Sequence, residues 1–348
     1  MAELWFWLCA LMIAVYVATD GFDFGAGMLH LFATRSDSER RQVLAAIGPY
    51  WDGNEVWLLA SGGALFLAFP KVLAAGFSGF YMAVFLIVWM LILRGIAIEF
   101  RSHVQETLWR RFWDVGFCCA SFGLPLLLGA ALGNVLRGVP LDERGWFALP
   151  LFESFSPRGA LGLLDWYTLA IGGFAVVVIA LHGANYLVWK TDGPVAERAR
   201  RAAGPLWIAS TLGWIGATEL TFVVNSTISE HLAERGLPKL LLGVAAAAWL
   251  LIGFAILRRK ELLAFVGSSL WILAMLATTA SCVFPVLLRT SGSQHESLSI
   301  LNAASSEDGL RTALRWWSIG IPIALAYFAL LFRLHRGKAS AAAEGEGY

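Results

Sequence analysis

Long runs of apolar residues, separated by short polar stretches, fill the chain from its first residues to about position 333. A run of about 20 apolar residues is long enough to cross the hydrocarbon core of a membrane as a helix. This criterion predicts nine membrane-spanning helices, at 5–31, 54–74, 77–99, 114–136, 161–189, 204–225, 238–257, 262–288 and 313–333. The pattern therefore predicts an all-α polytopic membrane protein.

Short motifs recur in the same order in the two halves of the chain. The matched pairs are Glu39-Arg40 with Glu197-Arg198, Gly48-Pro49 with Gly204-Pro205, and Ser121 and Pro125 with Ser281 and Pro285, at offsets of 158, 156 and 160 residues. Two units of four spans each would have the same orientation in the membrane, which is a parallel repeat. We therefore predict two parallel four-helix units and one peripheral ninth helix.

The repeat and the loop charges together predict a domain order and an orientation. The predicted parts are a first four-helix unit at 1–136, an extracytoplasmic linker at 137–160, a second four-helix unit at 161–288, a loop and ninth helix at 289–333, and a disordered cytoplasmic tail at 334–348.

The loops after the odd-numbered spans, with the tail, hold 16 Lys and Arg, against 9 in the N-terminus and remaining loops. Cytoplasmic loops carry the excess of Lys and Arg. This bias predicts a periplasmic N-terminus and a cytoplasmic C-terminus.

Composition excludes several classes of protein. With 58% hydrophobic and 15% charged residues, the chain has too little charge to cover a soluble globular surface. A net charge of +1 gives no reason to expect a nucleic-acid partner. No His pair has the spacing of a metal or haem site, and the four Cys lie inside apolar runs. We therefore expect no metal bound by this chain, and no set of haems ligated by it alone.

Ionisable residues within the predicted spans carry the chemical information, because a charge in a membrane is costly unless it is paired or hydrated. They form three clusters: Asp20 and Asp23 in the first span, the segment Trp51-Asp52-Gly53-Asn54-Glu55-Val56-Trp57 opening the second, and Arg94 with Glu99 at the end of the third. Structural roles are the alternative to a functional site. Gly21 and Gly25 predict a groove in which another helix packs closely, and Asp52 could cap its helix. Glu219 is a further acid in the sixth span.

We hypothesise that these clusters converge at one level of the membrane, as a proton route or as a structural salt-bridge cluster. The residues of the predicted proton path are Asp52, Glu99, Asp23 and Arg94. A supporting polar cluster is predicted from Asp20, Asn54, Glu55, Trp51 and Trp57. The predicted order runs from Asp52 to Glu99 and then inward past Arg94, with Asp23 lining the same path.

These segments resemble subunit II of the cytochrome bd-type quinol oxidases, including the cyanide-insensitive branch. The matching stretches are Thr19-Asp-Gly-Phe-Asp-Phe-Gly, Pro49-Tyr-Trp-Asp-Gly-Asn-Glu-Val-Trp-Leu, Gly62-Gly-Ala-Leu-Phe, Phe69-Pro70, Ser78-Gly-Phe-Tyr81 and Arg94-Gly-Ile-Ala-Ile-Glu-Phe-Arg. The resemblance implies a heterodimer in the bacterial inner membrane that oxidises quinol and reduces dioxygen to water. It places haem b and haem d in the partner, subunit I, and it associates the acids matching Asp52 and Glu99 with a proton path toward haem d.

The resemblance also leaves room for a structural quinone in this chain and for a small single-span subunit. A proton-coupled secondary transporter is the alternative function, because parallel repeats and intramembrane acids suit that architecture as well. A purely structural membrane scaffold is a third alternative. The acids favour the oxidase, since they gather toward the cytoplasmic ends of the spans instead of the midplane.

Overall fold

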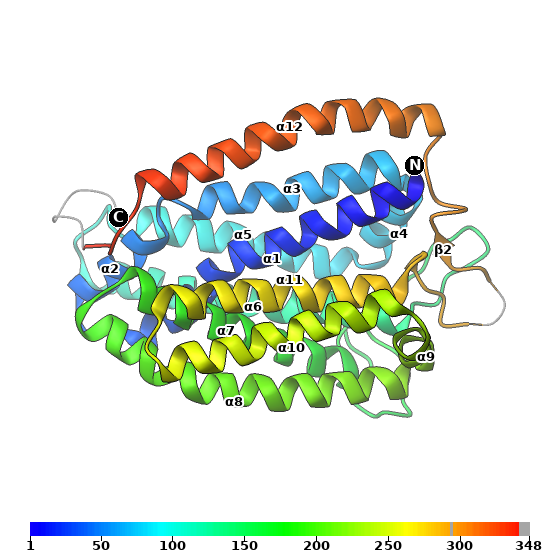
Figure 1. The fold of residues 1–348 in the computed structure, drawn as a ribbon. Coiled ribbons are helices and arrows are strands. Elements are labelled where there is room, and N and C mark those ends of the chain that lie inside the picture. Colours follow the sequence, from blue (N-terminus) through cyan, green and yellow to red (C-terminus); the bar gives the residue numbers. More distant parts are fainter. Residues whose placement is uncertain (293–294, 341–348) are drawn as a thin grey trace.

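The computed structural model describes residues 1–292 and 295–340, and helices dominate that part of the chain (Figure 1). The helices are α1 (Ala2–Ala33), α2 (Asp37–Ile47), α3 (Trp51–Ala68), α4 (Pro70–Gly79), α5 (Tyr81–Phe100), α6 (Thr107–Arg137), α7 (Trp166–Lys190), α8 (Gly193–Val224), α9 (Ser226–Glu234), α10 (Gly236–Leu257), α11 (Glu261–Val283) and α12 (Glu307–Leu334). Two short strands, β1 (Val286–Leu288) and β2 (Leu298–Ser299), pair antiparallel. The prediction of an all-α membrane protein is confirmed.

Within the described residues, eight helices are long and apolar enough to cross a membrane: α1, α5, α6, α7, α8, α10, α11 and α12. The helix α3 is not among them, because its polar first turn lowers its mean hydropathy. The prediction of one continuous span at 54–74 is wrong. The helix ends at Ala68, and Pro70, which cannot donate a backbone hydrogen bond, begins α4. The exact count of nine spans stays a prediction.

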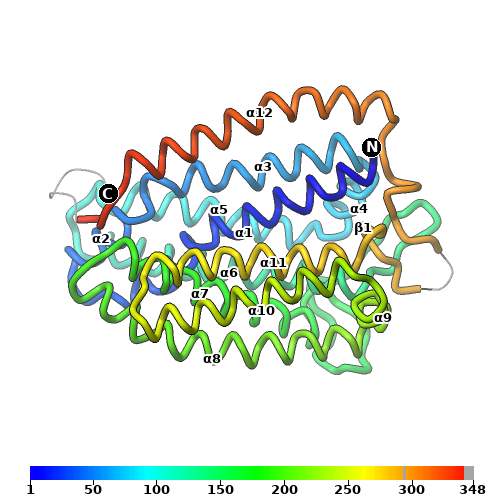
Figure 2. Tube along the Cα trace, in the orientation of Figure 1, coloured from blue at the N-terminus to red at the C-terminus, as the bar shows by residue number. Residues whose placement is uncertain are grey.

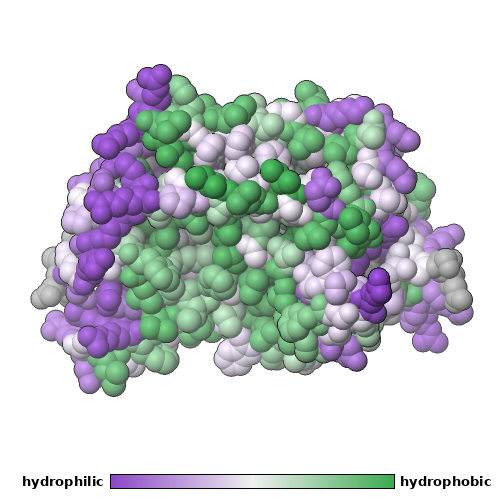
Figure 3. All heavy atoms as spheres, turned by 90° about the horizontal axis from the view of Figure 1, so that it is seen from below, coloured by the Kyte–Doolittle hydropathy of each residue, from purple (hydrophilic) through white to green (hydrophobic). Residues whose placement is uncertain are grey.

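The long helices run side by side, and the two marked ends of the chain lie at opposite ends of the bundle (Figure 2). The helix α3 runs along α1 between α1 and α12, so it occupies a place in the bundle despite its lower hydropathy. Figure 3 shows apolar side chains in a broad band between two polar ends on one face of the molecule. This band is the surface that a bilayer requires.

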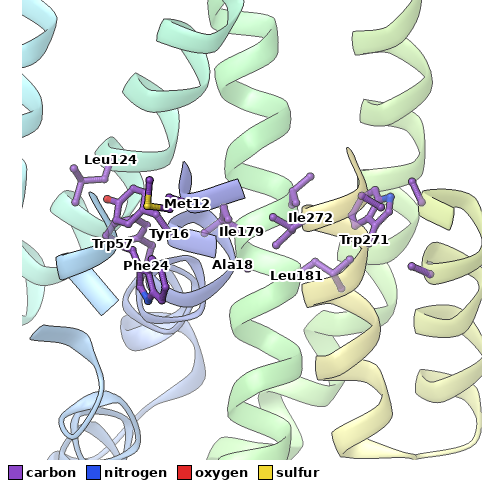
Figure 4. Close-up of a cluster of buried hydrophobic side chains, with 14 of the residues drawn as sticks. Met12, Tyr16, Ala18, Phe24, Trp57, Leu124, Ile179, Leu181, Trp271 and Ile272 are labelled. Atoms are coloured by element: carbon purple, nitrogen blue, oxygen red, sulfur yellow. The ribbon is translucent and has the colours of Figure 1, made fainter. Parts of the chain in front are cut away.

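The helix α1 lies at the centre of the bundle, where it packs against α3, α6, α7 and α11. The main apolar core forms along it from side chains such as Met12, Tyr16, Trp57 and Ile179 (Figure 4). By contrast, α12 is peripheral, and Leu310 is the one fully buried side chain that it contributes among the described residues. The predicted peripheral last helix is therefore present.

The segment after α12 is held against the body of the bundle. Lys190 Nζ donates to the carbonyl oxygens of His335 and Gly337, at 2.6 and 3.2 Å. Lys338 pairs with Glu261 in α11, at 2.6 Å. These contacts fall at the start of the tail predicted at 334–348, whose last eight residues, 341–348, lie outside the described residues. The predicted domain boundaries stay a prediction.

Candidate functional site

Arg94 is the centre of a buried polar cluster formed by α1, α3 and α5. Its side chain is fully buried, and its Nη1 lies 2.5 Å from Asp20 Oδ1 in α1. Its Nη2 lies 3.1 Å from Glu55 Oε1 in α3, and its guanidinium carbon stands 4.6 Å from the centre of the Phe24 ring. A buried charge of this kind is tolerated only when it is paired, and here two carboxylates pair with it.

A second polar contact ties α3 to α1 beside this ion pair. Asn54 Nδ2 donates to Asp23 Oδ2 at 2.7 Å and to the backbone oxygen of Thr19 at 3.2 Å. Both Asn54 and Asp23 are fully buried. Asp23 therefore pairs with the amide of Asn54, whereas Asp20 pairs with Arg94.

The cluster holds three carboxyl groups, those of Asp20, Asp23 and Glu55, for one guanidinium. Carboxylates that share a buried site repel one another, so such a group can take up and release protons. Glu55 is the one of the three with its side chain partly exposed, at 25%. Glu55 is therefore the acid of the cluster that reaches the surface of the chain.

The structure places the predicted site residues in two groups. Asp20, Asp23, Asn54, Glu55 and Arg94 come together in the buried cluster. Trp51 packs over Gly95 next to it, and Trp57 is buried with its ring 5.6 Å from that of Phe328 in α12. Asp52 and Glu99 are exposed, at the beginning of α3 and the end of α5, outside the buried cluster.

Asp52 does not have the helix-capping role that its position near the start of α3 suggested. The residue that caps α3 is Tyr50, and no side chain makes a capping hydrogen bond there. Sequence reasoning assigned Asp20 and Glu55 to a supporting role, yet these are the two direct partners of Arg94. The order from Asp52 to Glu99 to Arg94 stays a prediction.

Sequence reasoning missed a second buried network, centred on Asp114 in α6. His30 Nε2 lies 2.6 Å from Asp114 Oδ1, and Arg101 Nε lies 2.5 Å from the same oxygen. Arg40 Nη1 lies 2.8 Å from Asp114 Oδ2. His30, Asp114 and Arg101 are almost completely buried, so this network joins α1, α2, α5 and α6 at one end of the bundle. The available signal was an acid, Asp114, at the start of a span and three residues after the pair Arg110-Arg111.

Several buried polar atoms of the Arg94 cluster have no hydrogen-bond partner among the described residues. They are Tyr16 Oη, Asp20 Oδ2, Asp23 Oδ1, Asn54 Oδ1 and Arg94 Nε. Buried polar groups in native proteins are almost always hydrogen-bonded to protein or to ordered water. These atoms therefore keep the capacity to bind water or another polar group.

Both ring nitrogens of the buried His182 are engaged in hydrogen bonds. His182 in α7 has Nδ1 2.7 Å from Ser268 Oγ and Nε2 2.9 Å from the backbone oxygen of Ala18. Since both ring nitrogens are engaged, neither offers a free lone pair to iron. In His30, Nε2 lies 2.6 Å from Asp114 Oδ1, whereas Nδ1 has no hydrogen-bond partner among the described residues. In the described part of the chain, no group of His, Cys, Asp and Glu side chains is arranged to hold a metal ion.

Comparisons with known proteins agree on one family. The family model described as cytochrome bd terminal oxidase subunit II matches residues 1–335. The chain is 33% identical to cytochrome bd-I ubiquinol oxidase subunit 2 of Escherichia coli K12, over 94% of this chain and 92% of that protein. It is 28% identical to cytochrome bd ubiquinol oxidase subunit 2 of Bacillus subtilis, over 89% and 88%.

The fold also matches a solved structure. The bd oxidase from Geobacillus thermodenitrificans superposes with a TM-score of 0.74, over 96% of this chain and 98% of the matched chain. The sequence identity of that pair is 16%, so this match bears on the fold alone.

Proposed function

The chain belongs to the family of cytochrome bd terminal oxidase subunit II, and we propose that it supplies a proton route to the oxidase complex of which it is a part. The complex is a quinol:dioxygen oxidoreductase of the respiratory chain, and this chain is an integral membrane subunit of it. The names of the relatives describe oxidase subunits, which leaves no support for the alternatives of a transporter or a structural scaffold.

The observation that carries the proposal is the buried cluster of Asp20, Asp23, Glu55 and Arg94. Reduction of dioxygen to water consumes protons, so an oxygen-reducing site within the membrane needs ionisable groups or water leading to it from one side. The cluster reaches from the partly exposed Glu55 to fully buried acids. Three carboxyl groups around one guanidinium are suited to binding and releasing such protons, because the guanidinium neutralises part of the negative charge.

In our proposal, Asp52 and Glu99 form the entrance of this route. Both are exposed at the end of the bundle where α3 begins and α5 ends. Asp52 lies in the same first turns of α3 as Glu55, and Glu99 lies just over one helical turn from Arg94 in α5. Protons would pass from these acids to Glu55 and then inward past the fixed positive charge of Arg94, with Asp23 lining the same path. We place this entrance in the cytoplasm, which puts the N-terminus in the periplasm and the C-terminus in the cytoplasm.

The experiment compares Asp52→Asn and Glu99→Gln in the purified complex, measuring quinol-driven oxygen consumption together with the reduced-minus-oxidised haem spectrum. An amide keeps the size of the side chain but does not carry a proton. We expect a normal haem spectrum and a fall in turnover of about tenfold or more, the scale of a lost proton-transfer group. Glu219→Gln, in an exposed acid of α8, is the matched control. Full assembly with wild-type turnover in both variants would refute the proton route.

We further propose that haem b and haem d are held by the partner, subunit I, and that none is ligated here. The engagement of both ring nitrogens of His182 supports this assignment. Expression of this chain without subunit I tests it: the purified protein should show no haem absorbance. A small single-span subunit in the same complex would appear in a mass spectrum of the purified oxidase.

A structural quinone in this subunit would fit an apolar cavity of about 210 Å³ between α1, α6 and the helices α7 to α11. Its lining is mostly aliphatic and aromatic, with Trp214, Thr218 and Thr279 among the walls. An isoprenoid quinone is largely apolar, and such cavities bind apolar ligands with few polar contacts. Extraction of the purified complex and mass analysis of its quinones test this assignment, with Thr218→Phe as the variant that fills the cavity.

A further inference from the structure

A small cavity lies between α7, α8 and the turn that joins α10 to α11, and none of its lining residues belongs to the Arg94 cluster. The polar side chains in its wall are those of Asn185, Arg200, Arg259, Lys260 and Glu261. The turn lies at the end of the bundle where Figure 1 marks the C-terminus. Because α10 and α11 are both long and apolar enough to cross a membrane, the turn between them lies at the membrane surface. The cavity is therefore at the level of the lipid headgroups.

Three consecutive basic residues form the turn: Arg258, Arg259 and Lys260. All three are exposed, and none of them forms an ion pair in the part of the chain that the structure describes. Basic residues at this depth attract anionic lipid, and basic pockets between membrane-spanning helices bind anionic headgroups. The turn therefore has positive charge available for a ligand.

The two acids near the cavity already have cationic partners. Glu261 lies 2.7 Å from Arg200 and 2.6 Å from Lys338. Glu197 lies 2.9 Å from Arg200 and 3.5 Å from Arg201. Since three other cations pair with these two acids, the acids do not neutralise the turn.

Hydrogen-bond donors without acceptors line the same cavity. The Nδ2 atom of Asn185 has no hydrogen-bond partner among the described residues, although this residue is only 2% exposed. The helix α11 begins at Glu261 in the cavity wall, and no side chain makes a capping hydrogen bond to its first turn. A buried donor that stays unsatisfied is costly, and the N-terminus of a helix attracts anions. Both features favour a ligand with negatively charged oxygen atoms.

Exposed apolar side chains continue from the basic turn toward the membrane interior. They are Phe254 and Leu257 in α10 and Leu262 in α11, and Leu257 is 84% exposed. Each lies within about one helical turn of the basic residues. An anion bound at the turn is therefore next to a surface that acyl chains can cover. This arrangement favours a phosphate attached to acyl chains over free phosphate.

We propose that this cavity binds the phosphodiester headgroup of an anionic phospholipid. Its volume of about 20 Å³ admits one oxygen atom of the phosphate, while the rest of the headgroup stays at the mouth. That oxygen accepts a hydrogen bond from Asn185, and Arg259 and Lys260 neutralise the charge. The acyl chains lie along α10 and α11. The lipid thereby joins the ends of α7, α8, α10 and α11, independently of the proton route.

Removal of charge from the turn tests the proposal in the purified complex. The double variant Arg259→Gln, Lys260→Gln should hold one phosphatidylglycerol fewer than the wild type, counted by native mass spectrometry after delipidation and readdition of that lipid. The affinity for this lipid should fall about tenfold or more. The matched control is Arg111→Gln, Arg333→Gln, since both residues are exposed and neither lines the cavity. Equal lipid numbers in all three complexes would overturn the proposal.

The buried amide provides a second test. Asn185→Leu removes the donor and keeps about the same side-chain size, so the complex should assemble and lose the same lipid. If this variant keeps the lipid, the headgroup does not enter the cavity and the proposal is wrong.

Competition identifies the ligand. Neither phosphatidylcholine nor inorganic phosphate, at the same concentration, should displace phosphatidylglycerol from the wild-type complex. Displacement by inorganic phosphate would assign the cavity to free phosphate. Displacement by phosphatidylcholine would show that negative charge does not select the lipid, and either result would refute the proposal.

Discussion

Gly25 in α1 and Gly183 in α7 lie against each other with their backbones in contact, and they are 158 residues apart. The same offset separates Glu39-Arg40 from Glu197-Arg198 in the sequence. The two helices that open the predicted repeat units therefore cross at corresponding residues. If a two-fold rotation axis relates the two repeat units, corresponding residues of the two helices meet where the helices cross at that axis.

Substitution at this crossing tests how much the close approach of α1 and α7 contributes to the stability of the complex. A Cβ atom on Gly183 would overlap the backbone of Gly25 and Ala26, which no side-chain movement relieves. We expect Gly183→Ala to destabilise the complex by about 1–3 kcal/mol or more, the usual cost of overpacking. Thermal unfolding of the purified complex measures it. Gly216→Ala in α8 is the control, because a Cβ there meets open space; equal melting temperatures for the two variants would contradict the prediction.

Removal of the cation at the centre of the cluster should prevent assembly. Arg94→Gln leaves Asp20 fully buried beside Asp23 without a cation, and breaking a buried ion pair on one side costs about 3–5 kcal/mol. We expect little haem-containing complex in membranes that carry this variant, as measured by the haem spectrum per unit of membrane protein. Arg315→Gln, in an exposed position of α12, should accumulate normally. If haem-containing complex with the Arg94 variant accumulated to the wild-type level, the ion pair between Asp20 and Arg94 would not be needed to hold α1 against α5.

The network at Asp114 should be structural instead of proton-conducting. Asp114→Asn takes the negative charge away from His30, Arg101 and Arg40 together. We expect a lower melting temperature, since Arg101 and Arg40 each lose a buried carboxylate partner, but near wild-type turnover per assembled complex. Asp308→Asn, exposed in α12, is the control for stability. A large loss of turnover in fully assembled Asp114→Asn would place this network on the proton route.

The ion pair between Glu39 and Arg198 should make stability depend on acid pH. Arg198 donates to both carboxylate oxygens of Glu39, at 2.8 and 3.2 Å, and this hydrogen bonding holds the pKa of Glu39 below its ordinary value of 4.5. A depressed pKa stabilises the folded state above pH 4.5, and that stabilisation is lost as the pH falls through the folded-state pKa. Melting temperatures of wild type and Glu39→Gln should differ at pH 7 and converge in acid. A constant difference from pH 7 to pH 3 would contradict this assignment.

Hydropathy predicted the span positions well, because the apolar length needed to cross a bilayer is a property of the sequence alone. The interruption between α3 and α4 was missed. A proline within an apolar run is compatible with a kinked continuous helix, and only the packing around Phe69 decides for a break. The sequence thus predicted the approximate positions of the long apolar segments better than their continuity.

The residues of the buried cluster were all among the predicted ones, but their pairing was not predicted, nor was the position of Asp52 and Glu99 outside the cluster. Spacing of three residues places Asp20 and Asp23 on one side of α1, yet it does not tell which of them faces α5 and which faces α3. That choice depends on the rotation of three helices about their axes, which tertiary packing sets. The Asp114 network was missed for a related reason, since the partners of Asp114 come from positions 30, 40 and 101.

The polar first turn of α3 bears on how the chain enters the membrane during its synthesis. Acids near the centre of a segment weaken its partition into lipid by about 2.5–3.5 kcal/mol each, and those at its ends by less. Asn54 pairs with Asp23 in α1, which is synthesised before α3. Glu55 pairs with Arg94 in α5, which is synthesised after α3. Stable insertion of α3 is thus a shared property of three helices, and it is complete only once α5 has followed it into the bilayer.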